Sequence, residues 1–366
     1  MRASLLVVSL SLVGAVPGQA SHVVGPGGHA QISDAIAVAS PGDVVLVLPG
    51  TYNFFTVSMG LTILALTPGT VSIASAGIAG TSAAPPAGQA VHFVGITFPQ
   101  VHVQGRVTFD TCTIVGPVHF FGAPLMCAMA NVHLQSCVVR GVLQTGHNNG
   151  TVFASGSEIT AIDSTFEGAS AVPPFTVGTV AVMLAGSKLR ASSSTFLAGT
   201  STTSTAPAAI TGFPSSTAFV ADSTLTSTLP ACPVSSVSGR QARCTMTPPC
   251  GLPAGPSLGV HRPQPPQLGA PFVLEFRTGA GVPIGCFAAL DLDNVLVPGI
   301  EQSVLLSIPG AWFAGGAVAD ATGLASMSWS IPALSAIQYR TLWFQAVDAS
   351  NLQALQASPV AGGVIR

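Results

Sequence analysis

The residues best suited to acid-base chemistry in this 366-residue chain gather in one stretch. Arg140, His147 and Asn148 lie in a polar segment, and His133 precedes them. Histidine changes charge near neutral pH, so His147 or His133 could act as a base while Arg140 binds an anionic group. The alternative is that His147 is a solvated loop residue without a chemical role. Arg140, His147 and His133 are therefore the candidate catalytic residues.

Carboxylates, which polysaccharide cleavage requires, are scarce in the same region. Glycoside hydrolysis needs two positioned carboxyl groups, and uronate lysis needs a cation that neutralises the substrate carboxylate. Residues 90 to 230 contain only five acids, with no adjacent Asp pair: Asp110, Glu158, Asp163, Glu167 and Asp222. No Cys/His cluster has the spacing of a zinc site. We therefore expect no metal and no cofactor, and a non-catalytic role before an enzymatic one.

A third chemical feature is a recurring threonine. Six similar segments carry, just before their last apolar residue, either Val138 or one of five threonines: Thr97, Thr113, Thr165, Thr195 and Thr224. If the segments stack as neighbouring strands, these hydroxyls form a file with a spacing of about 4.8 Å that could bind a glycan or ice. The alternative is that threonine simply suits an exposed strand. Long, irregular connections argue against ice.

The six segments share the pattern apolar-x-apolar-x-x-small-x-apolar. Apolar residues alternate with period two, lose one step and alternate again, which indicates two short strands joined by a corner. The position marked small holds Cys112, Cys137, Ser164, Ser194 or Ser223 in five segments. In the first segment it holds a larger residue, Ile96. The corner residues are all compatible with a turn: Gly95, Thr111, Ser136, Asp163, Ser193 and Asp222.

The spacing of the segments predicts a solenoid. Their last apolar residues follow one another after 16, 25, 27, 30 and 29 residues, as expected for one coil per repeat with connections of variable length. A coil that cannot bury its inward side alone must stack on its neighbours. A globular β-sandwich would not keep one phase break in register six times. We therefore expect a parallel β-helix.

The chain before these repeats resembles the entry of the right-handed parallel β-helix proteins of the pectin-lyase-like group. The residues that carry the resemblance are Ile32 to Ile36 with Ala39, followed by Gly42 to Tyr52. The resemblance implies a short amphipathic helix that caps the first coil, then the first strand and turn. It extends over residues 22 to 230 and implies no particular chemistry, because this fold hosts lyases, hydrolases, esterases, adhesins and structural modules.

The N-terminus and the cysteines predict export. Residues 1–20 combine Arg2, an apolar run and a Gly-Gln-Ala ending, which is typical of a signal peptide cleaved after Ala20. Seven cysteines would then enter an oxidising compartment. Cys112 and Cys137 share one inward position in successive repeats, where they either stack as small buried residues or form a disulfide.

The composition changes after residue 229. Residues 230–271 are rich in Pro and contain three cysteines, which indicates a semi-rigid linker that disulfides could tether. Residues 272–366 alternate apolar strands with Gly and Pro turns, as in a small antiparallel β-sandwich. Trp312, Trp329 and Trp343 could form a sugar-stacking platform there or belong to the core. The segment from Tyr339 to Asp348 is similar to a C-terminal domain of many exported bacterial proteins.

The composition limits the partners. Only 7% of the residues are charged, against about 25% in ordinary domains, and the formal charge is −2. No basic face is available for nucleic acid, and no membrane span is expected after signal cleavage.

We expect an all-β fold: a signal peptide (1–20), a parallel β-helix with a capping helix (21–229), a linker and a β-sandwich. The expected function is a secreted or cell-surface structural and glycan-interaction module; the alternative is a polysaccharide lyase or glycoside hydrolase with an atypical site.

Overall fold

The computed structural model describes residues 19–74, 80–118, 122–143, 150–172, 176–202, 207–227, 231–249, 252–255, 258–295, 304–348, 350 and 355–366. The predicted signal peptide falls almost entirely outside these residues. Two compact units divide the described chain, one over residues 19–255 and one from residue 258 onward. The first unit is built from parallel strands and the second from antiparallel strands.

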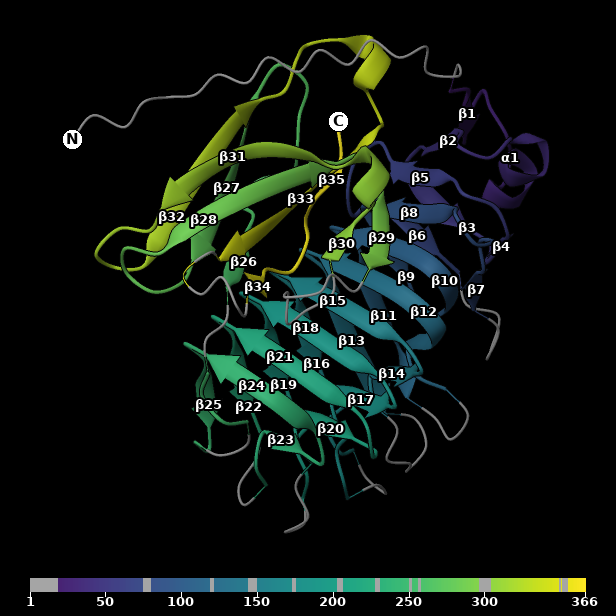
Figure 1. Cartoon of the computed structure of the whole chain (residues 1–366). Coiled ribbons are helices and arrows are strands. Elements are labelled where there is room, and N and C mark those ends of the chain that lie inside the picture. The colour runs from purple at the N-terminus through teal and green to yellow at the C-terminus, as the bar shows by residue number, and fades with distance from the viewer. Residues whose placement is uncertain are drawn as a thin grey trace. The chain divides into compact units, whose positions relative to one another are not determined.

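The first unit is a parallel β-helix whose strands stack in coil order (Figure 1). Each complete coil passes through three faces, which we call the first, second and third face. The long strands β10 (Val101–Asp110) and β12 (Leu125–Gln135) bend through both the first and the second face. This bend joins the two faces into one 16-stranded sheet, whereas the third face is a separate 9-stranded sheet.

Apart from β10 and β12, each strand belongs to one face. The first face contains β4 (Thr56–Val57), β7 (Thr81–Ala83), β14 (Val152–Ser155), β17 (Val182–Ala185), β20 (Ile210–Gly212) and β23 (Val234–Ser235). The second face contains β1 (Ser21–Val24), β2 (Val44–Val47), β5 (Thr62–Ala65), β8 (Ala90–Val94), β15 (Glu158–Ile162), β18 (Lys188–Ser192), β21 (Thr217–Ala221) and β24 (Ser238–Ala242). The third face contains β3 (Gly50–Tyr52), β6 (Val71–Ile73), β9 (Ile96–Phe98), β11 (Thr113–Val118), β13 (Val138–Leu143), β16 (Thr165–Glu167), β19 (Thr195–Leu197), β22 (Thr224–Thr226) and β25 (Thr245–Thr247).

The corner between the second and third faces is a single residue in the left-handed conformation. All six corner residues predicted from the repeat have φ between 50° and 69°, and Arg243 adds a seventh corner with φ 52°. This conformation costs an L-residue roughly 1–2 kcal/mol. A backbone hydrogen bond to the next coil holds each predicted corner; Asp163 N–H, for example, donates to Ser192 O (3.1 Å). The predicted corners are therefore confirmed.

The residues after five of these corners are buried, and the backbone N–H of each donates to a side chain one coil further along: Cys112, Cys137, Ser164, Ser194 and Ser223. Ser164 N–H donates to Ser194 Oγ (3.3 Å), and Ser194 N–H donates to Ser223 Oγ (3.0 Å). Each hydroxyl in turn donates to the carbonyl two residues earlier in its own coil, as Ser194 Oγ does to Ser192 O (2.8 Å). The small position of the repeat is therefore a coil-to-coil hydrogen-bonding position.

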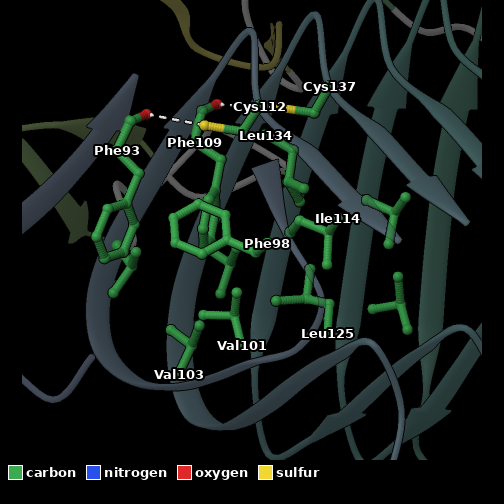
Figure 2. Close-up of a cluster of buried hydrophobic side chains, with 14 of the residues drawn as sticks. Phe93, Phe98, Val101, Val103, Phe109, Cys112, Ile114, Leu125, Leu134 and Cys137 are labelled. Atoms are coloured by element: carbon green, nitrogen blue, oxygen red, sulfur yellow. Dashed lines mark hydrogen bonds between the residues drawn. The ribbon is translucent and has the colours of Figure 1, made fainter. Parts of the chain in front are cut away.

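Cysteines serve the same purpose at the two ends of this ladder. Cys137 N–H donates to Ser164 Oγ (3.1 Å), and Cys112 N–H donates to the Cys137 sulfur. Both thiols are free, and they donate to the carbonyls of Phe93 and Phe109 in the preceding coil (3.4 and 3.3 Å; Figure 2). The two cysteines therefore stack as small buried residues and form no disulfide with each other. Ser223 N–H reaches Cys244 in the last coil.

A second left-handed corner, between the first and second faces, was not predicted from the repeat. Its residues are Gly105, Met129, Gly156, Gly186, Ser215 and Ser236, with φ between 49° and 70°. The same device follows it, because Ala130 N–H donates to Ser157 Oγ and Ser157 N–H to Ser187 Oγ (both 3.0 Å).

Inward side chains fill the coils with stacked apolar groups. Phe93 and Phe109 stack in successive coils with ring centroids 5.3 Å apart, and Phe98 meets Phe93 edge-on at 5.2 Å (Figure 2). Phe166 and Phe196 stack further along, 4.9 Å apart and nearly parallel. Phe93 and Phe109 belong to strands of the second face, whereas Phe166 and Phe196 belong to strands of the third face, so they form two separate stacks in the core.

A helix covers the first coil, as the resemblance implied. Helix α1 (Ile32–Val38) buries Ile32, Ala35 and Ile36, and Ala39, its C-cap residue, packs against the same core. The helix thus shields the apolar interior at this end of the solenoid.

The segment predicted as a linker contributes structure to both units. The strands β23, β24 and β25 form one more coil, and Gln241 N–H donates to Pro253 O (2.9 Å) beyond it. This coil keeps the corner residue Arg243 and the small residue Cys244, but two of its inward positions hold Gly239 and Gln241. The apolar pattern is therefore too weak to reveal it in the sequence.

The second unit consists of antiparallel sheets. One contains β26 (Gly259–His261), β27 (Pro271–Arg277) and β32 (Leu324–Ser330), and another contains β28 (Pro283–Ala289), β31 (Trp312–Val318), β33 (Thr341–Asp348), β34 (Gln356–Ala357) and β35 (Ala361–Val364). β29 (Leu292–Val295) pairs with β30 (Val304–Leu306), and the 3-10 turns are η1 (Ile308–Gly310) and η2 (Ser335–Ile337). The predicted fold class, a parallel β-helix followed by a β-sandwich, is confirmed.

The buried hydrogen-bond ladder makes a testable prediction about stability. Ser194→Ala removes the acceptor of the Ser164 N–H, and a buried donor without a partner costs about 1–3 kcal/mol. Ser194→Cys should recover most of that loss, because Cys137 occupies an equivalent position. Urea denaturation measures both effects. Ser155→Ala, at an exposed site, is the control and should change the free energy of unfolding by less than about 0.5 kcal/mol; equal losses in the Ala and Cys variants would contradict the role of the ladder.

Candidate functional site: the hydroxyl file of the third face

The predicted threonines form one file on the outward side of the third face. The strand register pairs Thr97 with Thr113, Thr113 with Val138, and Val138 with Thr165, and then continues through Thr195 and Thr224. All are partly accessible to solvent. The five predicted ligand-binding residues therefore lie together, one coil apart, with Val138 as the single apolar interruption.

The file is longer than the sequence pattern indicated. Thr51 and Ser72 precede it in register, and their hydroxyl oxygens are 3.0 Å apart. Thr245 in the last coil follows Thr224. We call these nine positions the threonine file: Thr51, Ser72, Thr97, Thr113, Val138, Thr165, Thr195, Thr224 and Thr245. Eight of them carry a hydroxyl group, so the file offers donors and acceptors over the whole length of the face.

The charged groups beside the threonine file are paired with one another. Arg140 forms a two-pronged ion pair with Glu167, its direct partner in the next strand, and this pair raises the pKa of Arg140. Arg243 likewise binds both carboxylate oxygens of Asp222 (2.6 and 2.8 Å). The third face therefore presents hydroxyl groups among locally neutralised charges.

The candidate catalytic residues are not brought together on one described surface. Arg140 lies on β13 of the third face, whereas His133 lies on β12 in the second face. His133 is buried, with Nε2 at 3.5 Å from Gln135 Oε1. His147 and Asn148 lie outside the described residues. Arg140 is bound to a carboxylate, so it lacks the free guanidinium that anion binding requires.

Sequence reasoning missed a polar file on the second face. In register along neighbouring strands lie His92, Thr108, His133, Thr160 and Arg190, which we call the second-face file. His92 Nδ1 is 2.6 Å from Thr108 Oγ1, and Arg190 Nε is 3.0 Å from Glu158 Oε1. The signal was present in the repeat, because each of these residues stands between the first two apolar positions of a segment.

The acids do not form a catalytic pair in the described residues. Asp110 and Glu158 occupy different columns of the second face, Glu167 is on the third face, and Asp163 and Asp222 stand at left-handed corners, as the turn interpretation predicted. Among the residues that the structure describes, no three His, Cys, Asp or Glu side chains converge on a point that could hold a metal ion.

The thiols are unsuited to nucleophilic chemistry. Cys112, Cys127, Cys137, Cys244 and Cys286 are free, and burial raises the pKa of Cys127 to about 12. A thiol in this state carries almost no thiolate at neutral pH. Cys232 is disulfide-bonded.

No protein-family model, no curated protein and no solved structure matches the chain. Within the described residues, no helix has the length and apolarity needed to cross a membrane. The site is therefore interpreted from its own geometry.

His92 of the second-face file predicts how the free energy of unfolding depends on pH. Burial, then the charges of Arg106 and His133, lower the pKa of His92 to about 4. An unfolded chain binds this proton near pH 6.5, so the folded state loses stability as the pH falls from 6.5 towards 4, by about 2 kcal/mol when the partial exposure of the ring is allowed for. His92→Gln should remove this part of the loss in urea titrations at pH 7 and 4.5.

The control for this experiment is His102→Gln, at an exposed position of β10. It should leave the pH dependence of the free energy of unfolding unchanged. An unaltered pH dependence in His92→Gln would contradict the neutral state of His92 in the folded protein.

Proposed function

We propose that this chain is a secreted, non-catalytic β-helix protein that binds a glycan along the third face, in the extracellular space or at the cell surface. The observation that carries the proposal is the threonine file. The hydroxyl groups of the file repeat at the coil spacing of about 4.8 Å. A polymer with regularly spaced hydroxyls can therefore form the same hydrogen bonds at every coil. The signal-peptide pattern of residues 1–20 and the likeness of Tyr339 to Asp348 to a C-terminal domain of exported bacterial proteins support export.

The ligand that fits this face is an uncharged polysaccharide. The pairs Arg140–Glu167 and Asp222–Arg243 already neutralise the charges beside the threonine file, so a charged polymer would gain little there. Hydroxyl groups suit sugar hydroxyls, since each can both donate and accept. The long, irregular connections come after the third-face strands. The corner between the second and third faces therefore carries no insertion.

Replacing hydroxyls by methyl groups tests the proposal. The triple variant Thr165→Val, Thr195→Val and Thr224→Val keeps the shape of the strands but removes three hydrogen-bonding groups, each worth roughly 1 kcal/mol. We expect at least a tenfold loss of affinity, about 1.4 kcal/mol or more, for the neutral polysaccharide that a glycan array selects. Affinity electrophoresis measures it, and an unchanged melting temperature shows that the fold is intact.

Thr211→Val, on β20 of the first face, is the matched control and should bind like the unmodified protein. Binding that the triple variant retains in full, or the absence of any glycan bound by the unmodified protein, would contradict the proposal.

A polysaccharide lyase or glycoside hydrolase with an atypical site is the second candidate. The observation behind it is the second-face file, where His92, His133 and Arg190 lie in one row beside Glu158. It ranks second because His133, Arg190 and Glu158 are buried. An activity screen on uronate and neutral polysaccharides decides between the two functions. Turnover that His133→Ala or His147→Ala abolishes would establish the enzyme, whereas binding without turnover would support the non-catalytic module.

A further inference from the structure

The tryptophans of the second unit do not form an exposed platform. Trp343 is fully buried in the core, and Trp329 stacks on Phe344 with ring centroids 4.3 Å apart. Trp329 Nε1 also donates to Ala314 O (2.9 Å). Two phenylalanines are exposed instead: Phe287 is 39% and Phe313 is 57% accessible. Exposed aromatic rings on one sheet face mark a binding surface more often than isolated apolar residues do.

Phe287 and Phe313 lie side by side on the outward side of one sheet. They are direct partners of the antiparallel strands β28 and β31, and their ring centroids are 5.6 Å apart with an angle of 69° between the rings. Their strand neighbours Cys286, Ala288 and Ala314 point inward and are buried. The two rings therefore pack edge to face as one aromatic pair, which we call the phenylalanine platform.

The rings lie over two glycines of the strand pair. A Cβ atom added to Gly285 would be 3.7 Å from Phe313 Cε2 and 3.9 Å from Phe287 Cε2, and one added to Gly316 would be 3.7 Å from Phe313 Cζ. The rings thus cover the backbone of the two glycines, which stand opposite each other in the strand pair. Both rings lie over this backbone, and the part of each ring that stays accessible, more on Phe313 than on Phe287, is available to a ligand.

The form of strand β31 disfavours a second protein strand as the occupant. β31 is an edge strand, because only β28 pairs with it among the described strands. The register shifts between Cys286 and Phe287, so Ala314 is an extra residue, and Gly315 has φ 145°. A bulge of this kind twists an edge away from regular pairing. Along its outer edge, β31 has peptide groups that pair with no described strand, and a small ligand with hydroxyl groups can bond to them.

The chemistry of the surface selects an uncharged ligand. Neither β28 nor β31 contains a charged residue, which excludes the electrostatic attraction that nucleic acid or acidic polymers need. A purely apolar partner would leave the edge peptide groups of β31 without water or partners. A pyranose ring satisfies both demands, because its C–H face packs on an aromatic ring while its hydroxyls bond to the strand edge.

We propose that the phenylalanine platform is a second glycan-binding site, which takes one or two neutral pyranose units of a polysaccharide. This inference rests on the proposed function only because both assume a neutral glycan as the ligand; the platform contains no residue of the third face. A chain with two such sites holds a polymer at two points, and the gain from the second contact depends on whether one polymer can reach both.

The experiment measures depletion of the full-length protein from solution by insoluble neutral polysaccharides. Phe313→Ala should reduce binding by about tenfold, because it removes the more exposed ring. Phe313→Trp should bind at least as well as the unmodified protein, since the larger ring keeps the stacking surface. Val318→Ala changes another exposed apolar residue of β31, 65% accessible, and is the control that should bind normally.

Two further measurements separate the possible failures. The threonine triple variant, tested in parallel, distinguishes the sites: loss of binding in Phe313→Ala alone supports the platform and contradicts the threonine file, and the reverse pattern overturns the platform. Sedimentation equilibrium gives the mass in solution. A dimer that Phe313→Ala converts to a monomer, with glycan binding unchanged, would show that the platform is a contact between two copies and overturn the proposal.

Discussion

The first unit depends on the hydrogen bond of one backbone N–H per corner. A left-handed corner turns the chain within one residue, and the next N–H then points into the coil, where it needs an acceptor other than a strand carbonyl. Ser194 Oγ and Ser223 Oγ provide this acceptor for the coil before them. Each hydroxyl also needs an acceptor for its own proton and finds the carbonyl two residues earlier. Serine and cysteine are small enough for this position and can both donate and accept, so they recur there.

This ladder determines which surfaces are available for function. Because buried side chains satisfy the corner groups, the outward residues next to them are free to vary without loss of the fold. Outside the same corners, the chain places Asp163, Thr165 and Glu167 at successive outward positions. Their regular placement is therefore a consequence of the internal ladder.

The sequence predicted the parts of the fold that repeat with one phase. The second-to-third corner and the threonine file both follow from the alternation of apolar residues with one lost step. The corner between the first and second faces escaped prediction because its residues share a backbone conformation but range in type from glycine to serine and Met129. The last coil escaped because Gly239 and Gln241 replace apolar residues. The phenylalanine platform could not be read from the sequence, since only the pairing of β28 with β31 brings Phe287 beside Phe313.

Electrostatics explains why hydroxyl groups, and not charges, form the long file. In-register coils place equivalent residues about 4.8 Å apart, where two like charges repel by about 3 kcal/mol at an effective dielectric constant near 20. Within the described solenoid strands, charged residues accordingly meet opposite or neutral partners: Arg140 faces Glu167, and Glu158 faces Lys188. A hydroxyl group can repeat indefinitely, because each one donates to or accepts from its neighbour, as Thr51 and Ser72 show. A long parallel solenoid that repeats one residue type on every coil therefore favours neutral side chains at that position. A ligand that binds along such a file is, for the same reason, favoured to be a neutral polymer.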